Sequence, residues 1–164
     1  MIWRCNWHVH RIVPMGNEAL LIPQMCGPIL LFDGYCPFCN FVVRMIYRLD
    51  RSGTILFAPI ESERGRAVIE RHPEVKALDS AFLLEHDEYG TERISAKSDM
   101  LARLADYIAW PGKLLLLPFK IIPCRIGDLL YDQVARNRNR LFGRYESCPL
   151  PSRGLRDRFI SNHK

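Results

Sequence analysis

The stretch from Ile29 to Phe41 constrains the fold of this chain more than any other. A short apolar run stops at Asp33-Gly34, and two cysteines in C-x-x-C spacing, Cys36 and Cys39, follow where a helical pattern begins. These signals in this order predict a buried strand, a tight turn and the start of a helix. Both sulfur atoms are therefore expected at the N-terminus of a helix that leaves the end of a strand.

A cysteine in the first turn of a helix has a physical reason to be reactive. The unpaired N–H groups and the positive end of the helix dipole stabilise a thiolate, so we expect Cys36 to be the attacking sulfur. Pro37 suits this first turn, because its missing N–H costs nothing there. Cys39 lies about one turn further on, so its sulfur can reach back and resolve a mixed disulfide on Cys36.

Asp33, which precedes Cys36 closely, has two interpretations. It can act as a general base that takes the proton from Cys39, or it can fix the turn with Gly34 by local hydrogen bonding. Its charge also tends to raise the pKa of a nearby thiol, in opposition to the helix dipole. The sequence leaves both roles open.

The motif and two later stretches together resemble a known family. The run Asp33-Gly-Tyr-Cys36-Pro-Phe-Cys39 is similar to the signature of the DCC family of thiol-disulfide oxidoreductases, named for one aspartate and two cysteines. Residues 131–144 and the ending that runs from 148 to 160 resemble the family's C-terminal half. The resemblance implies a thioredoxin-like α/β fold and thiol-disulfide exchange at Cys36 and Cys39, with Asp33 as the third residue of the site.

The periodicity after the motif predicts a βαβ unit. Apolar residues at helical spacing indicate a helix from about Pro37 to Arg51, and the β-rich run Thr54–Ile60 indicates a second strand parallel to the first. Glu61–Arg71 suits a short helix, and His72 is interpreted as a residue at the end of that helix and not as a ligand.

A hairpin and a further helix are expected next. The runs Ser80–Glu85 and Glu92–Ile94 flank a polar turn, and Ser95 is a candidate cap for a helix with an apolar stripe. Thioredoxins and glutaredoxins place a cis-proline before the first strand of this hairpin, where it helps to bind substrate backbone. The corresponding Leu78-Asp79-Ser80 has no proline, and the T-V-P segment that binds glutathione is absent, so neither docking mode is expected.

The segment Trp110–Pro123 is the most apolar of the chain. Its three prolines interrupt a sustained amphipathic helix, so we expect it to pack on the core. The alternative is a membrane-surface anchor, with Lys113 and Lys120 near the lipid headgroups.

A C-terminal helix is predicted from Cys124 to about Phe142, with acidic residues early and arginines late. Arg136, Arg140 and Arg144 recur at intervals of four and are expected to form a solvated face. Residues 120–164 carry 10 basic and 4 acidic side chains, so the net charge of +5 belongs to the tail. No base-reading motif accompanies these arginines, and nucleic-acid binding is not expected.

Residues 1–27 contain no secure element, since prolines and glycines interrupt every period. We expect a poorly ordered extension there, or a functional start at Met15 or Met25, and a single thioredoxin-like domain over 28–164 with a helical C-terminal part. A zinc site is an alternative for the thiols and imidazoles, which are Cys5, His8, His10, Cys26, Cys36 and Cys39. A structural site needs four ligands and only one C-x-x-C pair is present, so we expect no metal and no cofactor.

Six cysteines in irregular spacing, without a visible signal peptide, favour a reducing compartment such as the cytoplasm. No apolar run is long enough to predict a membrane-spanning helix. The favoured function is a thiol-disulfide oxidoreductase that acts on a disulfide or dithiol substrate, preferably a protein. The alternative is a non-catalytic thioredoxin-like binding or adaptor domain, with or without association to a membrane surface.

Overall fold

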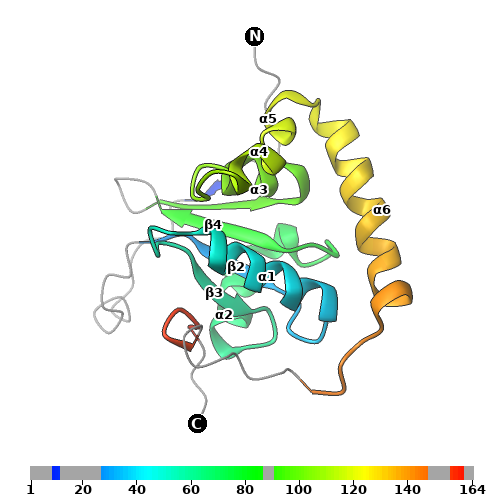
Figure 1. Cartoon of the computed structure of the whole chain (residues 1–164). Helices are drawn as coiled ribbons and strands as arrows, with labels where there is room; N and C mark the ends of the chain where they lie inside the picture. The colour runs from blue at the N-terminus through cyan, green and yellow to red at the C-terminus, as the bar shows by residue number, and fades with distance from the viewer. Residues whose placement is uncertain (1–8, 12–26, 87–90, 148–155, 161–164) are drawn as a thin grey trace.

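A five-stranded sheet forms the centre of the molecule (Figure 1). The computed structural model describes residues 9–11, 27–86, 91–147 and 156–160. The strands lie in the order β1-β5-β4-β2-β3. They are β1 (Val9–Arg11), β2 (Ile29–Phe32), β3 (Leu56–Pro59), β4 (Phe82–His86) and β5 (Glu92–Ala96). β2 and β3 are parallel and all other neighbours are antiparallel, which confirms the expected parallel pair and the hairpin.

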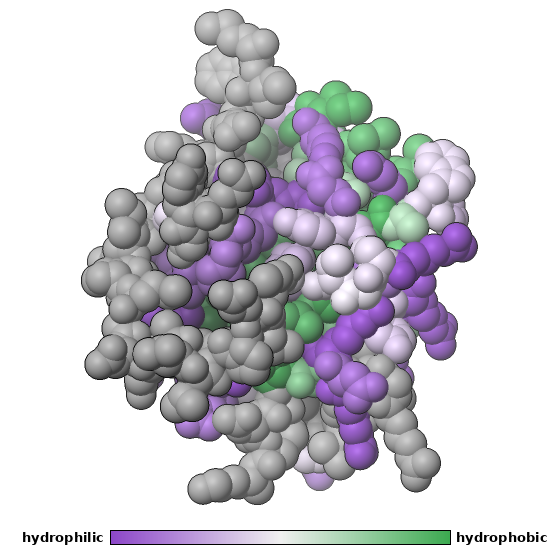
Figure 2. Space-filling view, turned by 90° about the vertical axis from the view of Figure 1, so that its left-hand side faces the viewer, coloured by the Kyte–Doolittle hydropathy of each residue, from purple (hydrophilic) through white to green (hydrophobic). Residues whose placement is uncertain are grey.

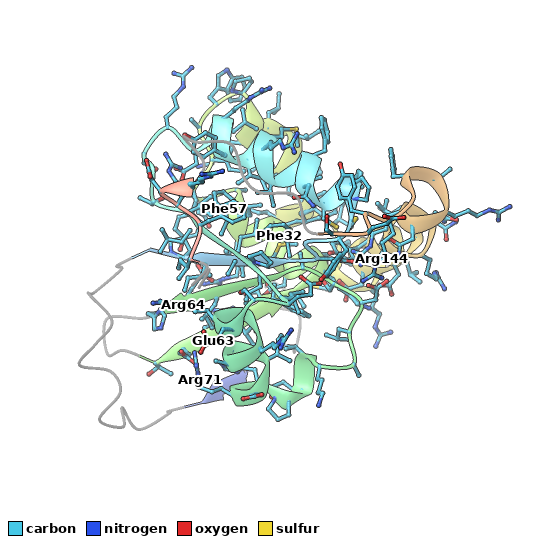
Figure 3. All side chains as sticks on the ribbon, turned by 90° about the horizontal axis from the view of Figure 1, so that it is seen from below. Phe32, Phe57, Glu63, Arg64, Arg71 and Arg144 are labelled. Carbon is cyan, nitrogen blue, oxygen red and sulfur yellow. The ribbon has the colours of Figure 1, made fainter. Side chains whose placement is uncertain are left out.

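Helices cover both faces of this sheet. α1 (Pro37–Leu49) connects β2 to β3, and α2 (Glu63–Arg71), capped by Ser62, leads through the short η2 (Pro73–Val75) to the hairpin. α3 (Lys97–Leu104) follows β5. Figure 3 shows α2, with Glu63 and Arg64, on the side of the sheet opposite α1. This arrangement is consistent with the expected thioredoxin-like fold.

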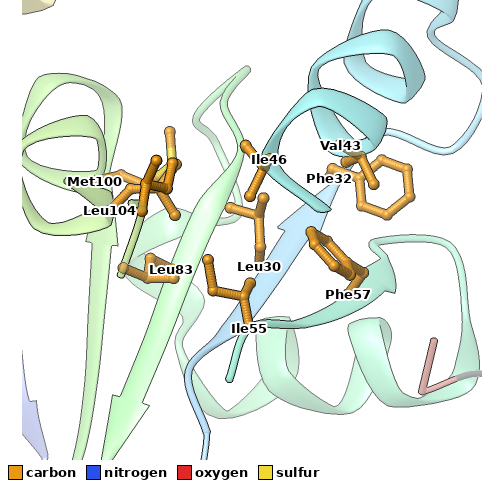
Figure 4. Packing of buried hydrophobic residues seen from close by; sticks show 10 residues of the cluster. Leu30, Phe32, Val43, Ile46, Ile55, Phe57, Leu83, Met100 and Leu104 are labelled. Carbon is orange, nitrogen blue, oxygen red and sulfur yellow. The ribbon is translucent and has the colours of Figure 1, made fainter. Parts of the chain in front are cut away.

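The two faces of the sheet carry separate apolar clusters because side chains alternate along each strand. On one face Leu30 and Phe32 of β2 pack with Val43 and Ile46 of α1 and with Leu104 of α3 (Figure 4). On the other face the intervening residues pack under α2; the cluster is Leu31, Ala58, Val68, Val75, Phe82, Leu84, Ile94 and Ala96. Each large apolar side chain buried in this way contributes about 1.5 to 3 kcal/mol, so the strand that leads to the cysteines is anchored from both sides.

Ser95 does not cap the next helix, contrary to the expectation. It lies inside β5, where it pairs with Leu83, and the strand continues through Ala96 before α3 begins. The hydroxyl of Ser80 fulfils part of the capping role, since it accepts a hydrogen bond from Lys97 N at 3.2 Å. The strand thus extends two residues beyond the expected end at Ile94, because pairing with β4 holds it.

The expected burial of residues 110–123 is wrong. They form two short helices, α4 (Gly112–Leu116) and α5 (Pro118–Ile121), which pack through only part of their surface and leave most of their apolar side chains in solvent. Among the described residues no helix is both long enough and apolar enough to cross a membrane.

The long helix α6 (Cys124–Phe142) stands along one side of the molecule and contacts α3 and α1 (Figure 1). Its buried residues are Gly127, Ala135 and Arg138, so its leucine-rich face points away from the body. Further along the chain, Phe159 pairs with Phe57 of β3 and lies against Phe32. The C-terminal half of the chain therefore returns to the strands that carry the cysteine motif.

Candidate redox site

The two cysteines lie at the start of α1, as the sequence predicts. Cys36 is the N-cap residue, and its Sγ accepts a hydrogen bond from Cys39 N at 3.1 Å. Pro37 occupies the first turn, and the chain enters the helix through a bond from Cys36 N to the carbonyl of Asp33 at 3.3 Å. The N–H group of Cys39, in the first turn of the helix, is therefore directed at the sulfur of Cys36, where it stabilises negative charge.

Polar side chains hold the turn before Cys36 in place. Buried Asn40 donates from Nδ2 to the carbonyls of Gly34 and Cys36, both at 2.9 Å. Asp33 Oδ1 accepts from Tyr35 N at 2.9 Å, which is the local bond expected of a turn-fixing aspartate. Gly34 N donates to Glu61 at 3.1 Å. The turn that positions the thiols is thus held by Asn40 from α1 and by Glu61 from the segment after β3.

The two thiols differ in exposure, and the surroundings of Cys39 act on its pKa. Cys36 is fully buried, whereas Cys39 is partly exposed. Burial raises the pKa of Cys39 well above its ordinary value, and its hydrogen bond to Cys36 and the negative charges of Cys36 and Asp33 act in the same direction. Cys39 therefore holds its proton firmly.

A buried arginine from α6 completes the charge distribution around the thiols. Arg138 is 5% exposed, and its NH2 nitrogen lies 3.7 Å from Asp33 Oδ2 and also bonds to Asp79. Its positive charge lowers the pKa of Cys39, against the effect of burial. The Nε of Arg138 is buried without a hydrogen-bond partner among the described residues. A cation with spare donor capacity thus lies beside the sulfur atoms.

Sequence reasoning missed Arg138 because the more obvious pattern on α6 is the leucine stripe. The signal that identifies the inner face is the set of residues that recurs one helical turn apart on the opposite side: Gly127, Tyr131, Ala135 and Arg138. The arginines singled out instead lie elsewhere. Arg136 and Arg140 are exposed, and Arg144 lies beyond the helix over the ring of Tyr35, 5.5 Å from its centroid.

Tyr131 lies against the segment that leads into β4, where the sequence has no proline. Its hydroxyl accepts a hydrogen bond from Ala81 N at 3.0 Å, directly after the proline-free stretch Leu78-Asp79-Ser80. Burial raises the pKa of Tyr131, so the hydroxyl stays protonated. Because the N–H of Ala81 is already bonded, it is not available to pair with an extended substrate backbone.

The segment after α6 crosses the cysteine motif. Phe142 stacks on Phe38 with ring centroids 5.2 Å apart, and Tyr145 N donates to the carbonyl of Tyr35 at 2.8 Å. Together with the contact between Arg144 and Tyr35, these bonds join residues 142–145 to both sides of Cys36. Figure 3 shows Arg144 at this end of α6.

The zinc interpretation concerned residues that fall largely outside the described part of the chain, namely Cys5, His8 and Cys26. Within the described ranges no group of three or more histidine, cysteine or acidic side chains is arranged to hold a metal ion. His72 lies at the end of α2, as expected, where its ring is buried and bonded to Glu74 and Glu92.

Comparison with known proteins agrees with the resemblance that the cysteine motif shows to the DCC family. The family model described as DCC1-like thiol-disulfide oxidoreductase matches residues 30–144, which include both cysteines, Asp33 and Arg138. The Bacillus subtilis protein YuxK is 30% identical over 138 residues, which cover 84% of this chain and 96% of YuxK. A DCC family protein of Arabidopsis thaliana, named as chloroplastic, is 35% identical over 124 residues, which cover 75% of this chain and 69% of the plant protein. No solved structure matches.

Proposed function

Because the chain belongs to the DCC1-like thiol-disulfide oxidoreductase family, we propose that it exchanges electrons between the Cys36–Cys39 dithiol and a disulfide substrate. The observation that carries this proposal is the pair's position at the start of α1, where Cys36 Sγ accepts the Cys39 N–H. The substrate class is a disulfide or dithiol in a protein or a small molecule. The cytoplasm is the proposed compartment, since reducing surroundings keep such a pair as the dithiol.

The proposed reaction proceeds in two thiol-disulfide exchanges. The Cys36 thiolate attacks one sulfur of the substrate disulfide, and the other substrate sulfur leaves as a thiolate that takes up a proton. Cys39 then loses its proton and attacks Cys36, which releases the second substrate thiolate and leaves a Cys36–Cys39 disulfide. Two electrons pass from the dithiol to the substrate, and the same steps in reverse oxidise a dithiol.

The raised pKa of Cys39 supports this assignment of roles. A thiol that holds its proton firmly is a poor first nucleophile, so Cys39 is suited to wait as the resolving group. Arg138 assists the second step, because its charge favours the thiolate of Cys39. Asp33 uses one carboxylate oxygen to fix the turn, and we propose that the other, 3.7 Å from Arg138, receives the proton of Cys39.

Burial of Cys36 is the observation that favours a second candidate function. A non-catalytic binding domain needs no access to its thiols, whereas an oxidoreductase must expose Cys36 to its substrate. Under the proposed function, Cys36 therefore has to become accessible during turnover. We propose that residues 142–145, which contact Tyr35 and Phe38 on either side of it, move away from the motif. The two functions differ in whether Cys36 ever forms a mixed disulfide.

Trapping that intermediate is the decisive experiment. Cys39→Ser should accumulate a mixed disulfide on Cys36 with a reducible substrate such as insulin, detected by mass spectrometry, while Cys36→Ser should form none and lose turnover. Cys26→Ser, in a cysteine outside the motif, is the matched control and should behave as the wild type. Failure of Cys39→Ser to trap any substrate, in a folded protein, would favour the binding domain.

The base role of Asp33 has its own test. Asp33→Asn retains an oxygen that can accept the Tyr35 N–H but removes the proton acceptor. Stopped-flow release of reduced substrate should then slow in the second step, while formation of the mixed disulfide continues. An unchanged release rate would leave Asp33 as a turn residue only.

A further inference from the structure

The exposed sides of α4, α5 and the first half of α6 form an apolar surface, here called the α4–α6 surface. Its main side chains are Trp110, Leu114, Leu115, Ile121, Ile126 and Leu129, which are between 51% and 79% exposed. α4 contacts α5, and both α5 and α6 contact α3, so α4, α5 and the beginning of α6 lie together at one end of the molecule (Figure 1). In Figure 2 apolar side chains gather at the height where Figure 1 places α4 and α5.

The packing of α6 explains why its apolar side chains point outward. The helix approaches α3 so closely that a Cβ at Gly127 would come within 2.7 Å of Ser98 Cβ. Small residues and Arg138 fill the inner face, which leaves no room there for Leu129 or Ile126. Large contiguous apolar patches are uncommon on monomeric proteins and mark interaction sites.

The charges around this surface indicate the kind of partner. Within residues 110–130 every exposed charged side chain is basic: these are Lys113, Lys120 and Arg125. Lys120 is bonded to Asp106, so Lys113 and Arg125 are the cations that remain for a partner. Leucines and isoleucines with a tryptophan and basic side chains beside them are typical of segments that rest on a bilayer. Protein hot spots, in contrast, are depleted in leucine.

We infer that the α4–α6 surface docks on an anionic lipid bilayer. Leu115 and Ile121 enter the boundary between headgroups and acyl chains, while Lys113 and Arg125 meet the lipid phosphates. About 18 Å of helix separates Ile126 from Arg138, at about 1.5 Å per residue, so the cysteines stay clear of the lipid. This inference concerns where the protein is held and does not depend on the proposed redox chemistry.

Co-sedimentation of the full chain with vesicles tests the inference. The wild type should bind phosphatidylcholine vesicles that contain phosphatidylglycerol and should bind pure phosphatidylcholine much more weakly. Leu115→Ser with Ile121→Ser should lower the partition coefficient about a hundredfold, at roughly tenfold for each inserted side chain. Lys113→Glu with Arg125→Glu should weaken binding at least about thirtyfold at low salt, since each basic residue near an anionic surface contributes about 1 kcal/mol and every 1.4 kcal/mol is about tenfold.

Matched controls come from α1. Phe41→Ser removes an apolar side chain that is 62% exposed, and Arg44→Glu with Arg48→Glu reverses two exposed charges; neither should change binding. Circular dichroism verifies that every variant is folded. The inference would be overturned if the wild type bound both kinds of vesicle equally or bound neither. It would also be overturned if the variants of the α4–α6 surface bound as well as the wild type. A wild-type dimer in sedimentation velocity that Leu115→Ser with Ile121→Ser dissociates would overturn it as well.

Discussion

Two buried cationic groups lie in different parts of the molecule, and each stands between two carboxylates. Arg138 on α6 contacts Asp33 and Asp79 beside the cysteines. His72 at the end of α2 bonds through Nδ1 to Glu74 and through Nε2 to Glu92, both at 3.1 Å. Both ring nitrogens of His72 are therefore satisfied, whereas Nε of Arg138 is buried without a partner among the described residues.

This difference separates a closed network from one that keeps an unused donor. Glu92 also accepts two bonds from Arg71, so the His72 network is closed around its own charges. Burial acts to raise the pKa of Glu92, but the hydrogen bonds from His72, His86 and Arg71 outweigh it and hold that pKa far below its ordinary range. Arg138 instead keeps donor capacity near the sulfur atoms of Cys36 and Cys39. We propose that this unused donor serves the thiol exchange.

Replacement of Arg138 should have the largest effect on activity. Arg138→Met removes the charge that lowers the pKa of Cys39, so resolution of the mixed disulfide should slow by about tenfold to a hundredfold. The measurement is single-turnover release of reduced substrate. Arg138→Lys should recover part of the rate, and Arg136→Met, on the exposed face of the same helix, should not change it. If Arg138→Met and Arg136→Met slowed the release of reduced substrate equally, Arg138 would have no special role.

Replacement of His72 should affect stability and leave the chemistry intact. His72→Asn removes the bond to Glu92 inside the fold and should lower the free energy of unfolding by about 2 to 3 kcal/mol. Urea denaturation measures this loss. His86→Asn is the control, because His86 is 43% exposed and lies 3.6 Å from Glu92, so it should cost less than about 0.5 kcal/mol. If His72→Asn lowered the rate of thiol-disulfide exchange per folded molecule, the His72 network would not be purely structural.

The His72 network also predicts how stability depends on pH. The hydrogen bond to Glu92 raises the pKa of His72 above its ordinary value; burial opposes this effect, and Glu74 adds to it. A raised pKa in the folded state contributes stability that is complete below the unfolded pKa of about 6.5 and is lost as pH rises through the folded pKa. The difference in unfolding free energy between the wild type and His72→Asn should therefore shrink from pH 6 toward pH 9. A difference that grows with pH would contradict a protonated His72.

The smallest effect is expected for Tyr131, which lies beside Arg138 on the inner face of α6. Tyr131→Phe leaves the N–H of Ala81 without its acceptor and should cost about 1 kcal/mol of stability. The rate of exchange should change less than in Arg138→Met, because Tyr131 carries no charge. Thermal unfolding measures the loss, with Tyr145→Phe as a matched control at a tyrosine 39% exposed.

Local sequence signals were sufficient for the first half of the fold. The run before Asp33 is a strand because both of its faces are buried, and the helix begins at Pro37 because Cys36 and proline suit an N-terminus. The cysteine pair was therefore located from the sequence. A turn-fixing role was one of two that the sequence left open for Asp33, and the bond from Tyr35 N to its carboxylate agrees with that role. Ser95 was misassigned because strand pairing with β4, a contact between distant residues, decides where β5 ends.

The sequence by itself determined the strand, turn and helix that carry Cys36 and Cys39, since each depends on neighbours within a few residues. Only the tertiary structure decided which charge lies beside the thiols. Arg138 reaches them from about a hundred residues away, because Gly127 and Ala135 let α6 pack closely against the body. The same packing turned the leucines of α6 outward and brought residues 142–145 onto Tyr35 and Phe38, on either side of Cys36. Helical periodicity cannot reveal this, because it shows that a helix has two faces but not which one meets the core.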